Sequence, residues 1–160
     1  MKLALLGVGK LKDDAERAIV ARYMERLGQI GATVGLTSGG VAEIMESRAA
    51  TPPARKTAEA AELLKRLAAD AKTVALDERG RALTSEELAD ILRRWKDDGT
   101  RGATFVIGGP DGLDPAFVKT ADLAFSLGRI TLPHGLARAV LAEQLYRAAT
   151  LIAGHPYHRQ

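Results

Sequence analysis

The sequence predicts an α/β domain in which a parallel sheet is flanked by helices. Short apolar segments alternate along the chain with longer segments whose apolar residues recur at helical spacing. The chain has 160 residues, of which 46% are hydrophobic and 27% charged, as in ordinary globular domains. It shows no internal repeat and no linker, so a single domain over residues 1–160 is expected.

Two strands and one helix are predicted in the first part of the chain. The strands are expected at residues 2–6 and 33–36, which are short apolar runs. A helix is expected from Asp13 to Leu27, because Asp13 precedes Glu16 by three residues in a pattern close to a capping box. The apolar side of this helix is predicted to consist of Ala15, Ile19, Tyr23 and Leu27.

The alternation is interrupted at residues 38–53. This segment has no clear period and contains Gly39-Gly40 and Pro52-Pro53, so it is expected to be a long surface loop. A helix is expected to follow over residues 55–69. Its inward side is predicted to consist of Ala60, Leu63, Leu64 and Leu67.

Three more strands are predicted in the second half of the chain, at residues 73–76, 104–107 and 123–125. Thr84 and Glu87 form a capping box that begins a helix ending at Trp95, whose indole is interpreted as a core anchor. Asp114 and Pro115 supply the cap and the first residue of a short helix.

A last helix is expected from Pro133 to about Gly154. Its buried stripe is predicted to consist of Leu136, Val140, Leu141, Leu145 and Ile152. Glu143 and Arg147 are four residues apart and are interpreted as a surface ion pair. A polar and aromatic tail, residues 155–160, ends the chain.

Composition excludes several classes of protein. The chain has no cysteine, so disulfides and thiolate metal sites are excluded, and no metal is expected. No apolar run approaches the roughly 18 residues of a membrane span. The first residues lack the longer apolar region and cleavage site of a signal peptide. A cytoplasmic protein that does not enter the membrane is therefore expected.

The basic charge is concentrated at the C-terminal end. Residues 129–160 contain four arginines, one acidic residue and all three histidines, and they account for the whole formal net charge of +3. This distribution is compatible with binding to nucleic acid. A solvated basic helix explains it equally well, because the excess is small.

Three loops that follow predicted strands are candidate ligand sites, because ligands of open α/β sheets bind at the carboxyl ends of the strands. The first, residues 7–10, lacks the third glycine of a dinucleotide fingerprint, since Lys12 stands there, and is interpreted as a tight turn. The second, residues 107–112, has three glycines that would let the backbone approach a ligand, although a plain turn is an equal explanation. The third, residues 126–134, alternates apolar with small or polar residues and suits an adenine edge.

The motifs in and around these loops follow one another in a specific order, namely Gly7–Lys12; Leu76-Asp77, Gly80 and Ser85; Phe105–Gly109; Ser126-Leu127 and Thr131–His134; Arg138; Glu143–Ala148; and Pro156–His158. In this order and spacing they resemble the RlmH family, the 23S rRNA pseudouridine-N3 methyltransferases. The resemblance extends from residue 1 to the tail, and family members have about this length.

The resemblance implies a SPOUT-type fold with a C-terminal trefoil knot, with the knot and cofactor site roughly over residues 73–154. It also implies S-adenosylmethionine (AdoMet) as the cofactor. The cofactor-binding residues that carry over are Leu76, Gly108, Leu127, Gly128, Arg129, Ile130, Thr131 and Leu132. One departure is visible, because the family usually has Ser-Lys-Met where this chain has Gly128, Arg129 and Ile130.

The family further implies the partners of the chain. Its members act as homodimers whose active site lies at the subunit interface, with the tail of one subunit reaching toward the cofactor of the other. The implied substrate is the assembled ribosome, methylated at a pseudouridine in an exposed loop of the 23S rRNA.

Methylation at N3 requires that the imide lose its proton, and several residues are candidates for this chemistry. His134, Glu143 and His158 are candidate proton acceptors, directly or through water. Arg138 is a candidate to stabilise the anion that develops on the base. Tyr157 is a candidate to stack on the target base.

Two alternative functions remain open at this point. The chain could be a SPOUT methyltransferase that acts on another RNA or another atom. It could also be a non-enzymatic protein that retains the fold and binds the ribosome or RNA. Binding of AdoMet distinguishes the second alternative, because a pure binding module has no need of the cofactor.

Overall fold

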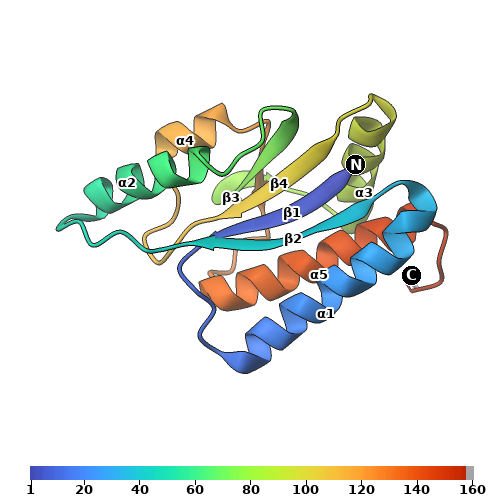
Figure 1. Ribbon diagram of the computed structural model, residues 1–160, viewed down its shortest axis with the longest axis horizontal. Helices are drawn as coiled ribbons and strands as arrows, with labels where there is room; N and C mark the ends of the chain where they lie inside the picture. The colour runs from blue at the N-terminus through green and yellow to red at the C-terminus, as the bar shows by residue number, and fades with distance from the viewer. Residues whose placement is uncertain (158–160) are drawn as a thin grey trace.

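The predicted parallel sheet is confirmed by the computed structural model, which describes residues 1–157 (Figure 1). Its strands are β1 (Lys2–Val8), β2 (Thr37–Ile44), β3 (Ala71–Ala82), β4 (Gly102–Ile107) and β5 (Leu123–Ser126). They lie in the order β2-β1-β4-β3-β5, and every neighbouring pair is parallel. The carboxyl ends of all five strands therefore meet at one edge of the sheet. The knot stays an implication of the resemblance.

The helices cover both faces of the sheet. They are α1 (Asp14–Gly31), α2 (Pro52–Leu64), α3 (Ser85–Asp97), α4 (Pro115–Thr120) and α5 (His134–Ile152). Helices α1 and α5 run side by side beneath the sheet, and α2 and α4 lie on the opposite face (Figure 1). Within residues 1–157, none of these helices combines the length and apolar character that crossing a membrane requires.

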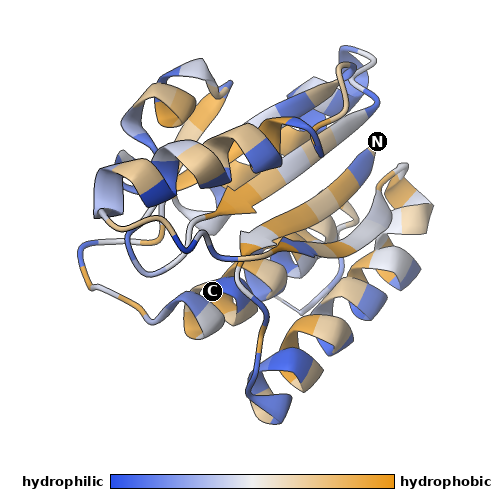
Figure 2. Cartoon of the chain, turned by 60° about the vertical axis from the view of Figure 1, so that its left-hand side comes forward, coloured by the Kyte–Doolittle hydropathy of each residue, from blue (hydrophilic) through white to orange (hydrophobic). Residues whose placement is uncertain are grey.

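Burial on both faces explains why the central strands β1 and β4 are almost continuously apolar (Figure 2). In β1, Leu3 and Leu5 belong to the core shared with α1, α3 and α5. Leu6 and Val8 point to the other side and pack with residues of α2 and α4. Each side chain of this strand therefore has an apolar layer to enter, whichever face it points to.

The predicted starts of α1, α3 and α4 are confirmed, because caps depend on local contacts. The helix predicted over residues 55–69 is displaced, since α2 begins at Pro52 and ends at Leu64. The Asp13 side chain accepts a hydrogen bond from the backbone N–H of Glu16, and Asp114 caps α4 in the same way. Thr84 and Glu87 form the predicted capping box at α3. Trp95 is half-buried against the core, as an anchor of that helix would be.

The predicted loop at residues 38–53 is wrong over its first half, which forms strand β2. The glycines that suggested a loop form a bulge instead, because Gly39 and Gly40 together lie opposite Ala4 of β1. Gly40 has a φ of +76°, and a Cβ on Gly39 would lie 2.8 Å from that of Ala4. The strand predicted at residues 33–36 is also wrong, since a short 3-10 helix and a turn occupy them.

Several predicted apolar stripes are shifted around their helices. In α1 the buried residues are Val20, Met24, Leu27 and Gly31, whereas the predicted Ala15 and Ile19 are exposed. In α2, Ala60 and Leu63 are buried but Leu64 is exposed. In α5, Leu141 and Leu145 are buried as predicted, but Leu136 and Val140 are exposed. Apolar residues occur all around α5, so periodicity could not identify its inward side.

Candidate active site

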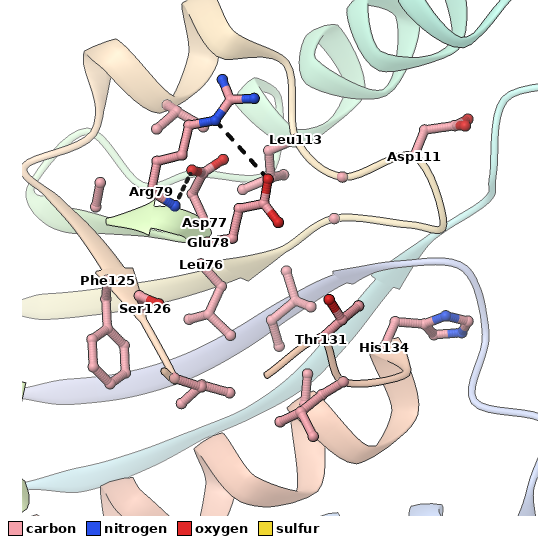
Figure 3. Close-up of a pocket in the computed structure, with 18 of the residues that line it drawn as sticks. Leu76, Asp77, Glu78, Arg79, Asp111, Leu113, Phe125, Ser126, Thr131 and His134 are labelled. Carbon is pink, nitrogen blue, oxygen red and sulfur yellow. Dashed lines mark hydrogen bonds and ion pairs between the residues drawn. The ribbon is translucent and has the colours of Figure 1, made fainter. Parts of the chain in front are cut away.

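A cavity of about 830 Å³ opens at the carboxyl ends of β3, β4 and β5 (Figure 3). This is where ligands bind in open parallel sheets, and the volume is in the range of small-molecule sites. Its wall is formed by residues 76–79, 107–113 and 124–132, together with residues of α2, α4 and the start of α5. The structure brings all eight residues predicted to bind AdoMet to this one wall, although binding itself stays a prediction.

The turn after β4 approaches itself so closely that Gly108 is required. A Cβ on Gly108 would lie 2.6 Å from the carbonyl carbon of Gly112 and 2.8 Å from the backbone nitrogen of Leu113. Gly112 has a φ of +80°, and its N–H donates a 2.9 Å hydrogen bond to the carbonyl of Gly109. The turn therefore presents bare backbone to the cavity, where a ligand can approach it.

The loop after β5 is held by a single hydroxyl. Ser126 Oγ donates to the carbonyl oxygen of Gly128 at 3.0 Å and accepts from its N–H at 3.2 Å. Gly128 has a φ of +117°, a conformation that side chains with a Cβ rarely adopt. Glycine therefore relieves strain at the position where the family usually has serine.

The chemistry of the wall suits AdoMet. Leu76, Ile107 and Leu127 provide apolar surface for an adenine ring, and the two glycine-containing loops provide backbone donors and acceptors. Asp77 and Glu78 line the cavity across from Thr131 and His134 (Figure 3). These carboxylates can face a cationic sulfonium or ammonium group. Among residues 1–157 no group of three or more His, Asp or Glu residues is arranged to hold a metal ion.

Of the predicted proton acceptors, His134 lies at the cavity. It is half-buried at the first residue of α5 and lines the wall. Glu143 does not line the cavity, because it lies about 13 Å farther along the same helix at the usual helical rise. His158 lies outside the described residues. The two described candidates for the proton acceptor, His134 and Glu143, therefore lie at separate places.

Glu143 belongs to a second cluster, formed with Arg147 and the tail. Its Oε1 accepts a hydrogen bond from Arg147 Nη2 at 2.6 Å and from the Tyr157 hydroxyl at 3.3 Å. The guanidinium of Arg147 lies 5.1 Å from the centre of the Tyr157 ring. The predicted ion pair is therefore present, but its predicted surface position is wrong. The side chains of Glu143 and Arg147 are only 17% and 30% exposed, and Tyr157 packs against them.

Tyr157 is packed and neutral in this cluster. Its ring meets that of Tyr146 edge-on, with 4.7 Å between the centres. Burial, together with the neighbouring Tyr23 and Glu143, raises the pKa of Tyr157 to about 12. At neutral pH the phenol keeps its proton, so it can donate a hydrogen bond but cannot serve as a base. Its predicted stacking on a target base stays a prediction.

Arg138 is enclosed rather than free to meet a substrate, because its side chain is 1% exposed. Its Nη1 donates to Glu43 Oε1 at 2.7 Å, and its Nη2 donates to the carbonyl oxygens of Val8 at 2.5 Å and Gly9 at 2.8 Å. A Cβ on Gly7 would lie 2.5 Å from the guanidinium carbon. This geometry favours a positioning role, in which Arg138 ties the ends of β1 and β2 to α5.

Sequence reasoning missed two residues that these contacts make important. Glu43 was placed in the supposed loop, so nothing identified it as the partner of Arg138. Arg55 was one charge among many on α2, yet it pairs with Asp111 in the turn after β4. The position of Asp111 beside three glycines of a candidate ligand loop was the one available signal.

Comparison with known proteins gives concordant matches. A family model described as "Predicted SPOUT methyltransferase" matches residues 1–158. A protein of Rhizobium etli called "Ribosomal RNA large subunit methyltransferase H" is 50% identical over 159 residues, 99% of each chain. A protein of the same name from Brucella anthropi is 49% identical over the same share.

Solved structures share the fold at low sequence identity. A probable methyltransferase from Bordetella pertussis Tohama I is 17% identical and superposes with a TM-score of 0.58 over 92% of this chain and 95% of its own. A probable methylase family protein from Haemophilus influenzae Rd KW20 is 14% identical, with a TM-score of 0.54 over 99% of this chain and 70% of its own.

Proposed function

The chain belongs to the SPOUT methyltransferase family and, within it, to the ribosomal RNA large subunit methyltransferases H, and on this premise we propose the reaction that it performs. It is an AdoMet-dependent enzyme that methylates ribosomal RNA. The target that we propose is N3 of a pseudouridine in the 23S rRNA of the assembled ribosome, as the resemblance to the RlmH family implies. The observation that carries this proposal is the cavity at the ends of β3, β4 and β5.

Different residues in and near this cavity would bind the cofactor, accept the proton and position the proton acceptor. AdoMet, when bound, supplies an activated methyl group, so much of the rate comes from orientation. The turn at residues 108–112 and the loop at residues 127–132, which line the cavity, would hold the cofactor through backbone groups. His134 stands on the same wall and takes the imide proton, directly or through water. Arg138 holds the beginning of α5, and so His134, in place.

We further propose that the chain acts as a homodimer through the outer face of α1 and α5. Three large apolar side chains are exposed there, Ile19 of α1 (37%) and Leu136 and Val140 of α5 (43% and 39%). Along α5, the helical spacing that joins Leu136 to Val140 continues to Glu143 and Arg147. A partner that covers this face would bring its own second cluster toward the cavity, which one protomer cannot do alone.

Substitution of Val140 by lysine is expected to convert the dimer to a monomer, because it places a charge in an apolar contact. Sedimentation velocity measures the change directly. Leu64→Lys is the matched control, since Leu64 is 55% exposed on α2, in the opposite layer, and this variant should remain dimeric. A monomeric wild-type chain with full activity would contradict the proposal.

Substitution of Gly108 by alanine is expected to weaken AdoMet binding by at least about tenfold, because the added Cβ displaces the backbone of the turn. Calorimetric titration with AdoMet measures the affinity. Gly28→Ala is the matched control, since its Cβ would meet only the Ser38 side chain at 3.5 Å. Equal affinities for both variants would count against the cavity. A wild-type chain that binds no AdoMet would favour the non-enzymatic alternative.

A further inference from the structure

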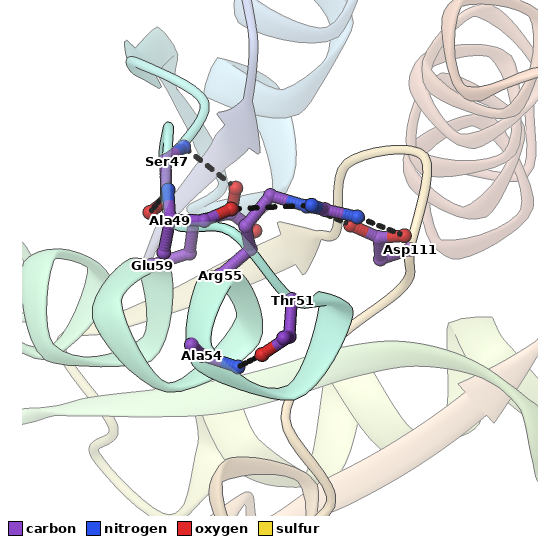
Figure 4. A network of polar contacts seen from close by, with 7 residues as sticks. All are labelled: Ser47, Ala49, Thr51, Ala54, Arg55, Glu59 and Asp111. Carbon is purple, nitrogen blue, oxygen red and sulfur yellow. Dashed lines mark hydrogen bonds and ion pairs between the residues drawn. The ribbon is translucent and has the colours of Figure 1, made fainter.

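Arg55 forms an ion pair with Asp111 in the turn at residues 108–112 (Figure 4). Arg55, in the first turn of α2, donates from Nε to Asp111 Oδ2 at 2.6 Å and from Nη2 to Asp111 Oδ1 at 3.2 Å. Its Nη1 also donates to the carbonyl oxygen of Ala49 at 3.2 Å. This two-point pairing fixes orientation as well as distance. The two side chains are 28% and 27% exposed, so solvent screens the pair only partly.

The conformation of this turn is expected to depend on the ion pair between Arg55 and Asp111. Three of its five residues are glycines, which have the largest conformational freedom to lose when a loop is ordered. Asp111 is at its tip, and its carboxylate points away from the other labelled side chains of the cavity (Figure 3). The Arg55 guanidinium keeps the pKa of Asp111 below its ordinary value, so the pair stays charged at neutral pH.

Helix α2, which carries Arg55, is held in place by several contacts. The beginning of α2 is capped by Thr51, whose Oγ1 accepts from the N–H of Ala54 at 3.4 Å. The buried carboxylate of Glu59 accepts from the N–H of Ser47 at 2.9 Å and so holds the segment before the helix. Ala60 and Leu63 pack α2 against the sheet. Arg55 therefore connects a turn of high intrinsic freedom to a helix that is fixed in the fold.

We propose that the pair of Arg55 and Asp111 is a positioning element of the cofactor site. It holds the turn at residues 108–112 in the shape that forms the cavity wall. Arg55 does not itself line the cavity among the described residues, so it acts through the turn. This inference rests on the proposed function for its ligand, AdoMet. The effect of the Arg55–Asp111 ion pair on the conformation of the turn does not depend on that ligand.

The test compares Arg55→Met, Asp111→Asn, the double variant and the charge-swapped chain carrying Arg55→Asp with Asp111→Arg. AdoMet affinity is measured by calorimetry, and hydrogen exchange is measured at the backbone amides of residues 109–113. Each single variant is expected to bind AdoMet about tenfold more weakly and to exchange faster in the turn. The double variant should be no weaker than either single variant, and the charge swap should recover most of the affinity.

Lys72→Met is the matched control. It removes an ion pair of similar length and exposure, from Lys72 Nζ to Asp122 Oδ1 at 2.8 Å, between the beginnings of β3 and β5. Affinity and exchange in the turn should not change in this variant.

Unchanged exchange in Arg55→Met would overturn the proposal, and so would unchanged AdoMet affinity. Weakening by Asp111→Asn alone would do the same, because it would mean that Asp111 contacts the cofactor directly. Failure of the wild-type chain to bind AdoMet would instead count against the proposed function. The hydrogen-exchange data would still show whether the Arg55–Asp111 ion pair orders the turn.

Discussion

Replacing Arg138 with methionine is expected to lower the free energy of unfolding by about 3 kcal/mol, the lower end of the usual cost of breaking a buried ion pair, because Arg138 is enclosed but Glu43 is 26% exposed. The substitution leaves the carbonyl oxygens of Val8 and Gly9 without the Arg138 donor, and leaves Glu43 Oε1 with only the backbone N–H of Leu11. The two carbonyl oxygens belong to buried residues, where water replaces the lost hydrogen bonds poorly. Denaturation in urea measures the change.

Arg101→Met is the control for this measurement. Its side chain is 83% exposed, and its Nη1 lies 3.6 Å from Asp70 Oδ2, so little stability should be lost. Similar losses in the two variants would contradict the structural role of Arg138. An Arg138→Met chain that keeps its stability and AdoMet affinity but loses methylation would restore the original interpretation, in which Arg138 stabilises the anion on the base.

Removal of residues 157–160 is expected to reduce methylation of ribosomes by about a hundredfold while the fold and AdoMet binding are retained. The truncation takes away Tyr157, which donates to Glu143 and lies under Arg147, and so disrupts the second cluster. The cavity at the carboxyl ends of the strands is lined by other residues. Stability should fall only modestly, because one aromatic pair contributes about 0.5–1.5 kcal/mol beyond its burial.

The Tyr157→Phe variant separates two explanations of this effect. It keeps the ring against Tyr146 and removes the hydroxyl that bonds to Glu143. Melting temperature, AdoMet affinity and single-turnover methylation should be measured for both variants. Untouched methylation in the truncated chain would show that the tail is not part of the active site. An equal fall in AdoMet affinity would assign the tail to the cofactor site instead.

Local features of the fold could be predicted from the sequence because their causes are local. The caps at Asp13, Thr84 and Asp114 involve residues within one helical turn, so their spacing is visible in the chain. The alternation of strands and helices likewise predicts a parallel sheet. Strand β2 escaped prediction, because Gly39 and Gly40 have the same local signature whether they form a loop or a bulge.

Non-local contacts could not be predicted in the same way. Arg138 and Glu43 are 95 residues apart, and Arg55 and Asp111 are 56 apart, so neither pair has a spacing that marks it. The helix faces of α1 and α5 were also misplaced, because apolar residues such as Ile19 also occur on the exposed sides of these helices. The residues predicted to bind the cofactor came from the resemblance to a family, which carries such long-range information.

The proposed reaction can be observed by incubating the purified chain with AdoMet carrying a labelled methyl group and with ribosomes that lack the modification. The 23S rRNA is then digested, and its nucleosides are identified by mass spectrometry. We expect one labelled product, N3-methylpseudouridine, formed on assembled ribosomes. Absence of label from ribosomal RNA, although the chain binds AdoMet, would contradict the proposed substrate. Label on a different nucleoside would contradict the proposed target atom.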